Sequence, residues 1–218
     1  MALERKRLNE IPSDAVMLSE EDALNYHYKI LNNWKNDSDV FAYRYGAIFL
    51  GITSSITGVY LNSHFRKKLK LFHYGKIASY LPLCTIPAFA AYLLHQQRIV
   101  RNLVLLNERQ CPVCLEIRAS AFQNFAGLGL PLVLTPIISL GLAHKYGTYN
   151  LPLMNHQPLE LVKVVGKLAK PIKNVIFGIF IGHALLGSIV TYFEAKSIYN
   201  VDHKLAELEK NLESQKIT

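Results

Sequence analysis

Acidic residues are scarce through most of this 218-residue chain, and Asp and Glu are missing from 40–107, 117–159 and 161–193. Charged residues form 18% of the chain, whereas they form roughly a quarter of an average soluble domain. Cysteine is also rare, with three in all, which excludes a disulfide-rich secreted module. Half of the residues are hydrophobic, which excludes a disordered chain.

Four long segments contain no Asp, Glu, Lys or Arg: 45–61, 77–94, 119–143 and 174–193. A membrane-spanning helix needs about 20 mostly apolar residues. Buried helices of a soluble bundle would normally keep a charged face, and these segments have none. We therefore expect an all-α, four-span transmembrane helix bundle over 41–193. A soluble N-terminal segment, 1–40, would precede it, and a helical C-terminal tail, 194–218, would follow.

Basic residues gather in the loop after the first run and in the loop before the fourth. The membrane-surface cations of these loops are Arg66, Lys67, Lys68 and Lys70, and then Lys163, Lys167 and Lys170. The positive-inside rule places both loops on one side of the membrane, which requires an even number of spans. The two termini and the middle loop would lie on the other side. The net charge of +8 is thereby explained without a nucleic-acid partner.

Prolines at matching spacing interrupt the second and third runs: Pro82 and Pro87, then Pro131 and Pro136. Proline removes a backbone donor and crowds the preceding turn, so both helices should kink. The broken helices could line a gated cavity. We favour a simple role in shape, since no charged residue lies within either run to mark a pathway.

Small residues at helical spacing predict close helix packing. Gly178 and Gly182 form a GxxxG motif in the fourth run, and Gly51 and Gly58 offer a similar seam in the first. The motif could hold the bundle together or meet another protein, and both alternatives stay open. His183 beside it is either a functional group or a neutral side chain bonded to the next helix.

Three amphipathic helices are expected outside the lipid. Ser19 and the acids after it predict a helix over 20–34, lying on the membrane surface or against a partner. The segment that Pro158 opens places Lys163, Lys167 and Lys170 beside an apolar face, which predicts an interfacial helix. It could also be a linker helix against the bundle, and the two roles are not exclusive. A short heptad-like repeat from Ile198 extends the fourth run as a helix.

Cys111 and Cys114 form a Cys-x-x-Cys motif between the second and third runs. A zinc site would need two further ligands, and the sequence has no second such motif and no His-x-x-x-His pair. We therefore predict no metal and no cofactor. A structural disulfide is the interpretation we favour, and a redox-active dithiol is the alternative.

The order and spacing of several motifs resemble the transmembrane protein 126 family. They are Ser63-x-Phe65-Arg66-Lys67, Ile77-Ala78-x-x-Leu81-Pro82, Ile86-Pro87, Cys111-x-x-Cys114-x-x-x-Arg118, Gly127, Pro131, Pro136 and Gly141-Leu142-Ala143-x-Lys145-Tyr146. The resemblance covers roughly 45–193.

This resemblance implies a multi-pass protein of the mitochondrial inner membrane that acts as an assembly factor for respiratory complex I. Its partners would be membrane-arm subunits, other assembly factors and the lipid bilayer, and no enzymatic chemistry is implied. The basic loops would face the matrix, with the termini and the Cys-x-x-Cys loop in the intermembrane space. The alternatives are a membrane thiol oxidoreductase, which would need a second cysteine pair, and a small-solute transporter, which the uncharged spans disfavour.

Overall fold

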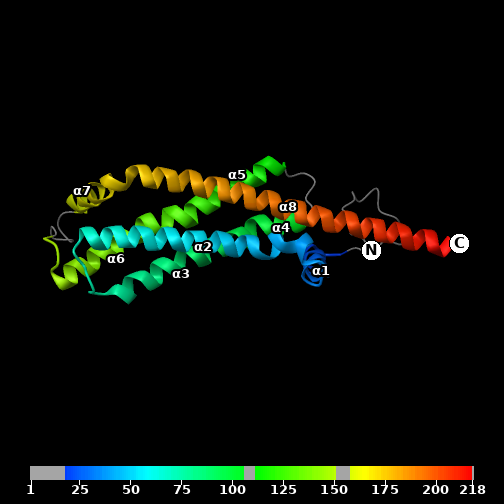
Figure 1. The fold of residues 1–218 in the computed structure, drawn as a ribbon, viewed down its shortest axis with the longest axis horizontal. Helices are drawn as coiled ribbons and strands as arrows, with labels where there is room; N and C mark the ends of the chain where they lie inside the picture. Colours follow the sequence, from blue (N-terminus) through cyan, green and yellow to red (C-terminus); the bar gives the residue numbers. More distant parts are fainter. Residues whose placement is uncertain (1–17, 106–110, 151–157, 218) are drawn as a thin grey trace.

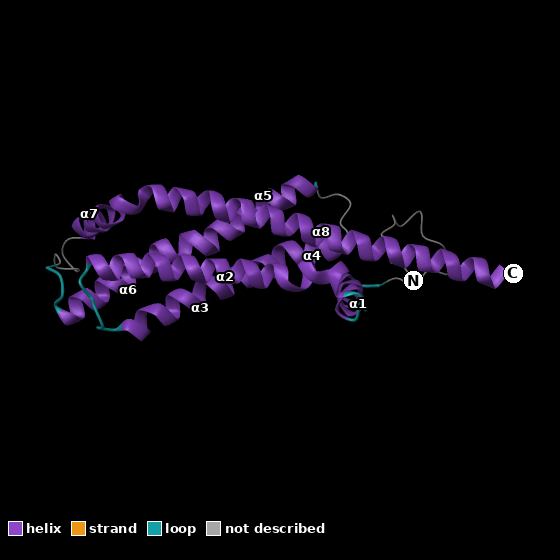
Figure 2. Cartoon of the chain, in the orientation of Figure 1, coloured by secondary structure: helices purple, strands orange, loops and turns teal. Residues whose placement is uncertain are grey.

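The computed structural model describes residues 18–105, 111–150 and 158–217, and every regular element in these ranges is helical (Figure 2). The first 17 residues of the predicted N-terminal segment lie outside the described residues. The helices are α1 (Glu20–Asn32), α2 (Asp37–Lys68), α3 (Lys76–His95), α4 (Arg101–Val104), α5 (Pro112–Asn124), α6 (Leu130–Tyr146), α7 (Pro158–Ala169) and α8 (Lys173–Ile217).

Helix α1 begins where the capping signal predicts. The Ser19 hydroxyl accepts a hydrogen bond from the backbone N–H of Asp22, and three acids occupy the first turn. Its apolar side packs on the chain itself: Leu31 is buried with Val40, Val100, Val104, Ile198 and Val201. One side of this helix therefore packs against α2, α4 and α8, and its predicted position on the membrane surface or against a partner stays a prediction.

The α2–α3 connection is a tight turn that Gly75 closes with a positive φ of 56°. Arg66, in the last turn of α2, is buried and reaches across this turn. Its guanidinium donates to the carbonyls of Phe72 (2.8 Å) and Tyr74 (3.0 Å) and to the Ser79 hydroxyl (2.8 Å). The prediction of Arg66 as a membrane-surface cation is wrong, because these acceptors hold the charge inside the hairpin.

Two π-helical turns interrupt otherwise continuous helices. Gln96–Val100 joins α3 to α4, and Phe125–Gly129 joins α5 to α6. The second turn ends two residues before Pro131, whose missing N–H leaves a helical carbonyl without its usual donor. Pro82 and Pro87 lie inside α3, and Pro136 lies inside α6. Kinks at these prolines stay a prediction.

The helices form an elongated bundle in which α2 contacts α3, α6 and α8, and α5 contacts α8 (Figure 1). Helix α7, the end of α2 and the end of α6 share one end of the bundle, at the left of the view. Helix α1 and the last part of α8 lie toward the other end. The two basic loops therefore meet at the same end, as their shared charge predicts.

Candidate functional site

Three helical stretches of the described residues are long and apolar enough to cross a membrane: 76–104, 112–146 and 159–212. They contain the second, third and fourth predicted runs. The first predicted run lies within α2, which is not among these three stretches. Large apolar side chains point outward from the bundle, among them Phe89 at 64% exposure, Ile137 at 61% and Phe177 at 64%. Such a surface is typical of helices dissolved in lipid.

A polar seam runs through the interior where α2, α5 and α8 meet. His183 of α8 is buried, with its Nε2 2.9 Å from the Thr57 hydroxyl of α2 and its Nδ1 3.0 Å from the Gln123 side-chain nitrogen of α5. The Thr57 hydroxyl also donates to the carbonyl of Thr53. Hydrogen-bond partners therefore assign a neutral imidazole, with Nε2–H donating to Thr57 and Nδ1 accepting from Gln123.

Gln123 extends this seam to the backbone of α2. Its side-chain nitrogen lies 3.1 Å from the Leu50 carbonyl and 3.1 Å from the Ser54 hydroxyl. Gly127 makes room for the cluster, because a Cβ there would come within 2.7 Å of the His183 ring. The arrangement joins three helices by buried hydrogen bonds, which contribute to the association of helices in lipid.

A second buried polar contact lies closer to the α1 end. Glu194 of α8 is fully buried, and its Oε2 is 2.7 Å from Nε2 of His95 at the end of α3. Its Oε1 has no hydrogen-bond partner among the described residues. That oxygen lies against Gly46 of α2, where any Cβ would overlap it. We predicted no role for His95 or Glu194, because each follows an apolar run by one residue.

Of the two predicted glycine seams, only the one in α2 lies close to another helix. Gly51 and Gly58 both face α3, so that a Cβ at Gly51 would lie 3.1 Å from the Ala88 carbonyl and one at Gly58 would overlap the Leu83 carbonyl. Gly178 and Gly182 have open space at their Cβ positions. Gly187 is the glycine of α8 that lies close to another helix, at Ser120 of α5. Contact of the GxxxG motif with a partner protein stays a prediction.

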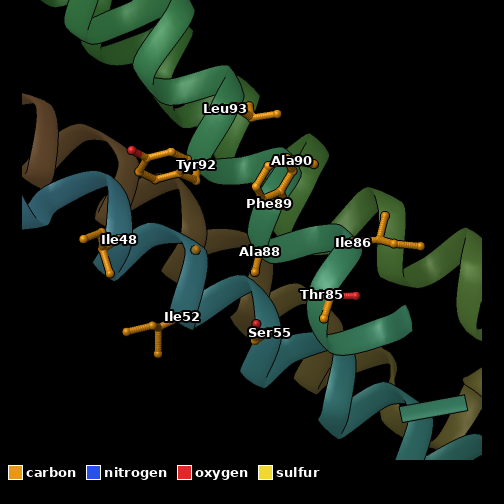
Figure 3. A pocket seen from close by; sticks show the side chains of 11 residues that line it. Ile48, Ile52, Ser55, Thr85, Ile86, Ala88, Phe89, Ala90, Tyr92 and Leu93 are labelled. Carbon is orange, nitrogen blue, oxygen red and sulfur yellow. The ribbon is translucent and has the colours of Figure 1, made fainter. Parts of the chain in front are cut away.

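An open apolar groove of about 870 Å³ lies between the outer faces of α2 and α3 (Figure 3). Ile48 and Ile52 form its α2 wall, and Ile86, Phe89 and Tyr92 form its α3 wall. The Ser55 hydroxyl in its floor donates to the Cys84 carbonyl at 2.8 Å, which satisfies the main polar group there. The groove is therefore suited to an apolar occupant.

The cations at the basic end are exposed, apart from Arg66; they are Lys67, Lys68, Lys70, Lys163, Lys167 and Lys170. The apolar side of α7 packs on the bundle, with Leu168 buried against Phe65, Leu69, Leu71 and Leu140. The Leu168 carbonyl also lies 3.0 Å from Nε2 of His64. Part of the apolar side of α7 is therefore covered by the bundle, while Leu159 and Val162 remain exposed. An interfacial position of this helix stays a prediction.

At the end of the bundle near α1, surface contacts hold the C-terminal part of α8 against α2. The Asp39 carboxylate accepts hydrogen bonds from Lys204 of α8 (2.6 Å) and from the Trp34 ring nitrogen (3.1 Å). These bonds, that of Lys204 foremost, hold the pKa of Asp39 below its usual range. The first half of the C-terminal extension therefore packs on its own chain through Ile198 and Val201, whereas Leu208 and Leu212 are exposed.

Cys111 and Cys114 are both exposed free thiols at the start of α5, and Cys84 is a partly buried free thiol of α3. The predicted disulfide stays a prediction. In the described part of the chain, no three His, Cys, Asp or Glu side chains are grouped so that they could hold a metal ion.

The long apolar helices, their lipid-type surface and the internal polar seam define an all-α membrane protein. A family model described as Transmembrane protein 126 matches residues 23–210. A curated Drosophila melanogaster protein named Transmembrane protein 126 is 34% identical over 216 residues, covering 99% of this chain and 96% of that protein. The chain belongs to the Transmembrane protein 126 family. No solved structure matches it.

Proposed function

We propose that the chain crosses the mitochondrial inner membrane four times, with α2 as the additional span. The first support is register. Gly46 is the second residue of the first predicted run, whereas His95 and Glu194 each lie one residue beyond the end of another. Glu194 lies against Gly46 and is hydrogen-bonded to His95. The start of the first run and the ends of the second and fourth runs therefore lie at the same position along the long axis of the bundle. The second support is that α2 packs along helices on several sides and presents Ile48, Ile52 and other apolar side chains outward.

The orientation that we propose places the basic end in the matrix, and the start of α5 in the intermembrane space. Single-cysteine variants test it with a membrane-impermeant maleimide on mitochondria stripped of their outer membrane. In a background lacking the native cysteines, Lys68→Cys should react only after the inner membrane is opened. A variant that retains Cys111 alone should react before that step. Labelling of both positions from the same side would contradict the four-span topology.

We further propose that the protein is an assembly factor for respiratory complex I and holds membrane-arm subunits before they are incorporated. The observation that carries this proposal is the open apolar groove between α2 and α3, together with family membership. An apolar groove between the outward faces of two helices suits the apolar side chains of a client subunit's transmembrane helix. The buried polar seam supports the role by keeping the remaining helices together while this face is open.

Deletion of the gene tests the cellular role. Native gels of solubilised mitochondria should show less mature complex I and more membrane-arm intermediates, with the other respiratory complexes serving as controls. Re-expression of the protein should restore the pattern. Normal complex I content and assembly kinetics in the deletion strain would contradict the assembly role.

Site-specific cross-linking tests the groove. A photoreactive residue at Ile52, in the groove and 54% exposed, should cross-link to a complex I membrane-arm subunit. The same residue at Ile137 of α6, 61% exposed and outside the groove, is the matched control. Equal yields of the same product from both positions would argue against a groove-bound client.

A further inference from the structure

The two exposed cysteines occupy defined positions in the first turn of α5. Cys111 is the N-cap residue, with non-helical backbone angles (φ −57°, ψ 124°), and Pro112 is the first helical residue. Cys114 is the third helical residue. Like the other N–H groups at the start of a helix, its backbone N–H has no helical carbonyl to which it can donate. An N-cap side chain and the third residue of the helix lie side by side. The two sulfurs are therefore neighbours on an accessible surface.

The two thiols are electrostatically unequal. The backbone N–H of Cys114, and then its thiol, donate to the Cys111 sulfur and lower the pKa of Cys111. The same thiol–sulfur hydrogen bond, with repulsion from a charged Cys111, raises the pKa of Cys114, although Arg118 opposes this. Cys111 is the residue that the helix start stabilises as a thiolate.

We propose that Cys111 and Cys114 form a reversible thiol–disulfide exchange site, in which Cys111 attacks a small disulfide of the glutathione type and Cys114 resolves the product. This inference is independent of the proposed role in complex I assembly. It assigns the two cysteines different roles, whereas a structural clip would make them equivalent.

The exchange is balanced in two steps. The Cys111 thiolate attacks one sulfur of glutathione disulfide, forming a Cys111–glutathione bond and releasing one glutathione thiolate, which takes up a proton. The Cys114 thiol then loses its proton and attacks the Cys111 sulfur, forming the Cys111–Cys114 bond and releasing the second glutathione. The dithiol is oxidised by two electrons, and one glutathione disulfide is reduced to two thiols.

The position of the site matters for the rest of the bundle, because α5 is joined to α8 immediately below it. Glu116 accepts a hydrogen bond from Ser188 (2.8 Å), and Ser120 donates to the Ala184 carbonyl (2.6 Å). These bonds anchor the helix, so that the dithiol is held on a fixed first turn. Exposed exchange sites of this kind are labile, whereas strongly stabilised structural disulfides resist reduction by glutathione.

The test uses the full-length chain in lipid nanodiscs, with Cys84→Ala removing the third thiol. The protein is treated with glutathione disulfide at neutral pH, quenched with acid and weighed by intact mass spectrometry. With both cysteines present, the product should lose two hydrogens and retain no glutathione. Cys114→Ser should retain one glutathione on Cys111, and Cys111→Ser should react several-fold more slowly. Reduced glutathione should return the oxidised protein to the dithiol.

Each alternative result overturns the proposal. Equal reaction rates of the two single-cysteine variants would remove the assigned roles. Stable attachment of two glutathiones would exclude resolution by Cys114. Resistance of the internal disulfide to reduced glutathione would establish a structural clip instead. Both positions are exposed, so unfolding is not expected, and an unchanged thermal transition of each variant confirms that the fold is retained.

Discussion

Gly58 is the position where the structure predicts the sharpest response to a single methyl group. Pro87 has no N–H, so the Leu83 carbonyl lacks its helical donor and turns to the backbone of α2 at Gly58. A Cβ at Gly58 would come closer than 3.0 Å to this carbonyl oxygen, a distance that real Cβ atoms essentially never show. The obstacle is backbone, so α3 must move as a whole.

The size of the effect follows from two opposing terms. Overpacking against a rigid neighbour costs about 3 kcal/mol at the upper end of its usual range. Replacing Gly by Ala inside a helix recovers about 1 kcal/mol. Gly58→Ala should therefore lose about 2 kcal/mol, which lowers the melting temperature by about 4–8 °C in a chain of this size.

Thermal unfolding of the purified protein in detergent, followed by circular dichroism, measures this effect. Gly182→Ala is the matched control, because it adds the same methyl group to open space. Gly51→Ala should lie between the two, since its Cβ would be 3.1 Å from the Ala88 carbonyl. A melting temperature of Gly58→Ala equal to that of Gly182→Ala would refute the predicted contact between α2 and α3.

Three further predictions concern the polar contacts. Arg66→Gln should lower the free energy of unfolding by about 2–3 kcal/mol, because the turn carbonyls lose a charged donor; an unchanged denaturation midpoint would exclude this role. A double-mutant cycle of His95→Ala and Glu194→Ala should give a coupling energy of about 1–3 kcal/mol, and additive effects would mean that the buried pair does not interact. The ionised Asp39 carboxylate, bonded to Lys204, stabilises the docked α8 extension at any pH above the ordinary pKa of an aspartate. Because the pKa of Asp39 is lowered, this stability is lost as the pH falls through that lowered pKa. Hydrogen exchange of the extension should therefore accelerate at acidic pH, and Asp39→Asn should remove that pH dependence.

The helical architecture could be predicted because its causes are local. Uncharged runs of about 20 residues have few structural alternatives, and each of the four runs lies within helical backbone in the structure. The Ser19 cap and the acids after it likewise mark the start of α1 through short-range contacts. The π-helical turns could not be predicted in this way. A proline marks a helix in which the hydrogen-bond register can change, but its position alone does not indicate where a wider turn forms.

The site residues were harder to predict because they depend on tertiary contacts. Arg66 belongs to a basic run, and only the fold of the turn brings carbonyls to its guanidinium. Glu194 looks like the first residue of a polar tail until His95 and Gly46 are placed beside it. The motif at Gly178 and Gly182 has the spacing of a packing seam, yet the close approach on that helix occurs at Gly187. Spacing indicates that helices can approach, but not which helix face is used.

The composition of α2 explains why its mean hydropathy is low for the fourth crossing that we propose. Its inward side carries Ser54, Thr57 and Gly58, which bond to or contact the surrounding helices, and these residues lower the average. Its outward side carries Ile52 and Ile56, exposed at 54% and 63%. In water this arrangement would be unfavourable, whereas in lipid it places apolar groups in the solvent and polar groups where partners satisfy them. The small and polar residues that lower the mean hydropathy of α2 are therefore those expected on the inward side of a central membrane helix. For this reason we propose α2 as the fourth crossing.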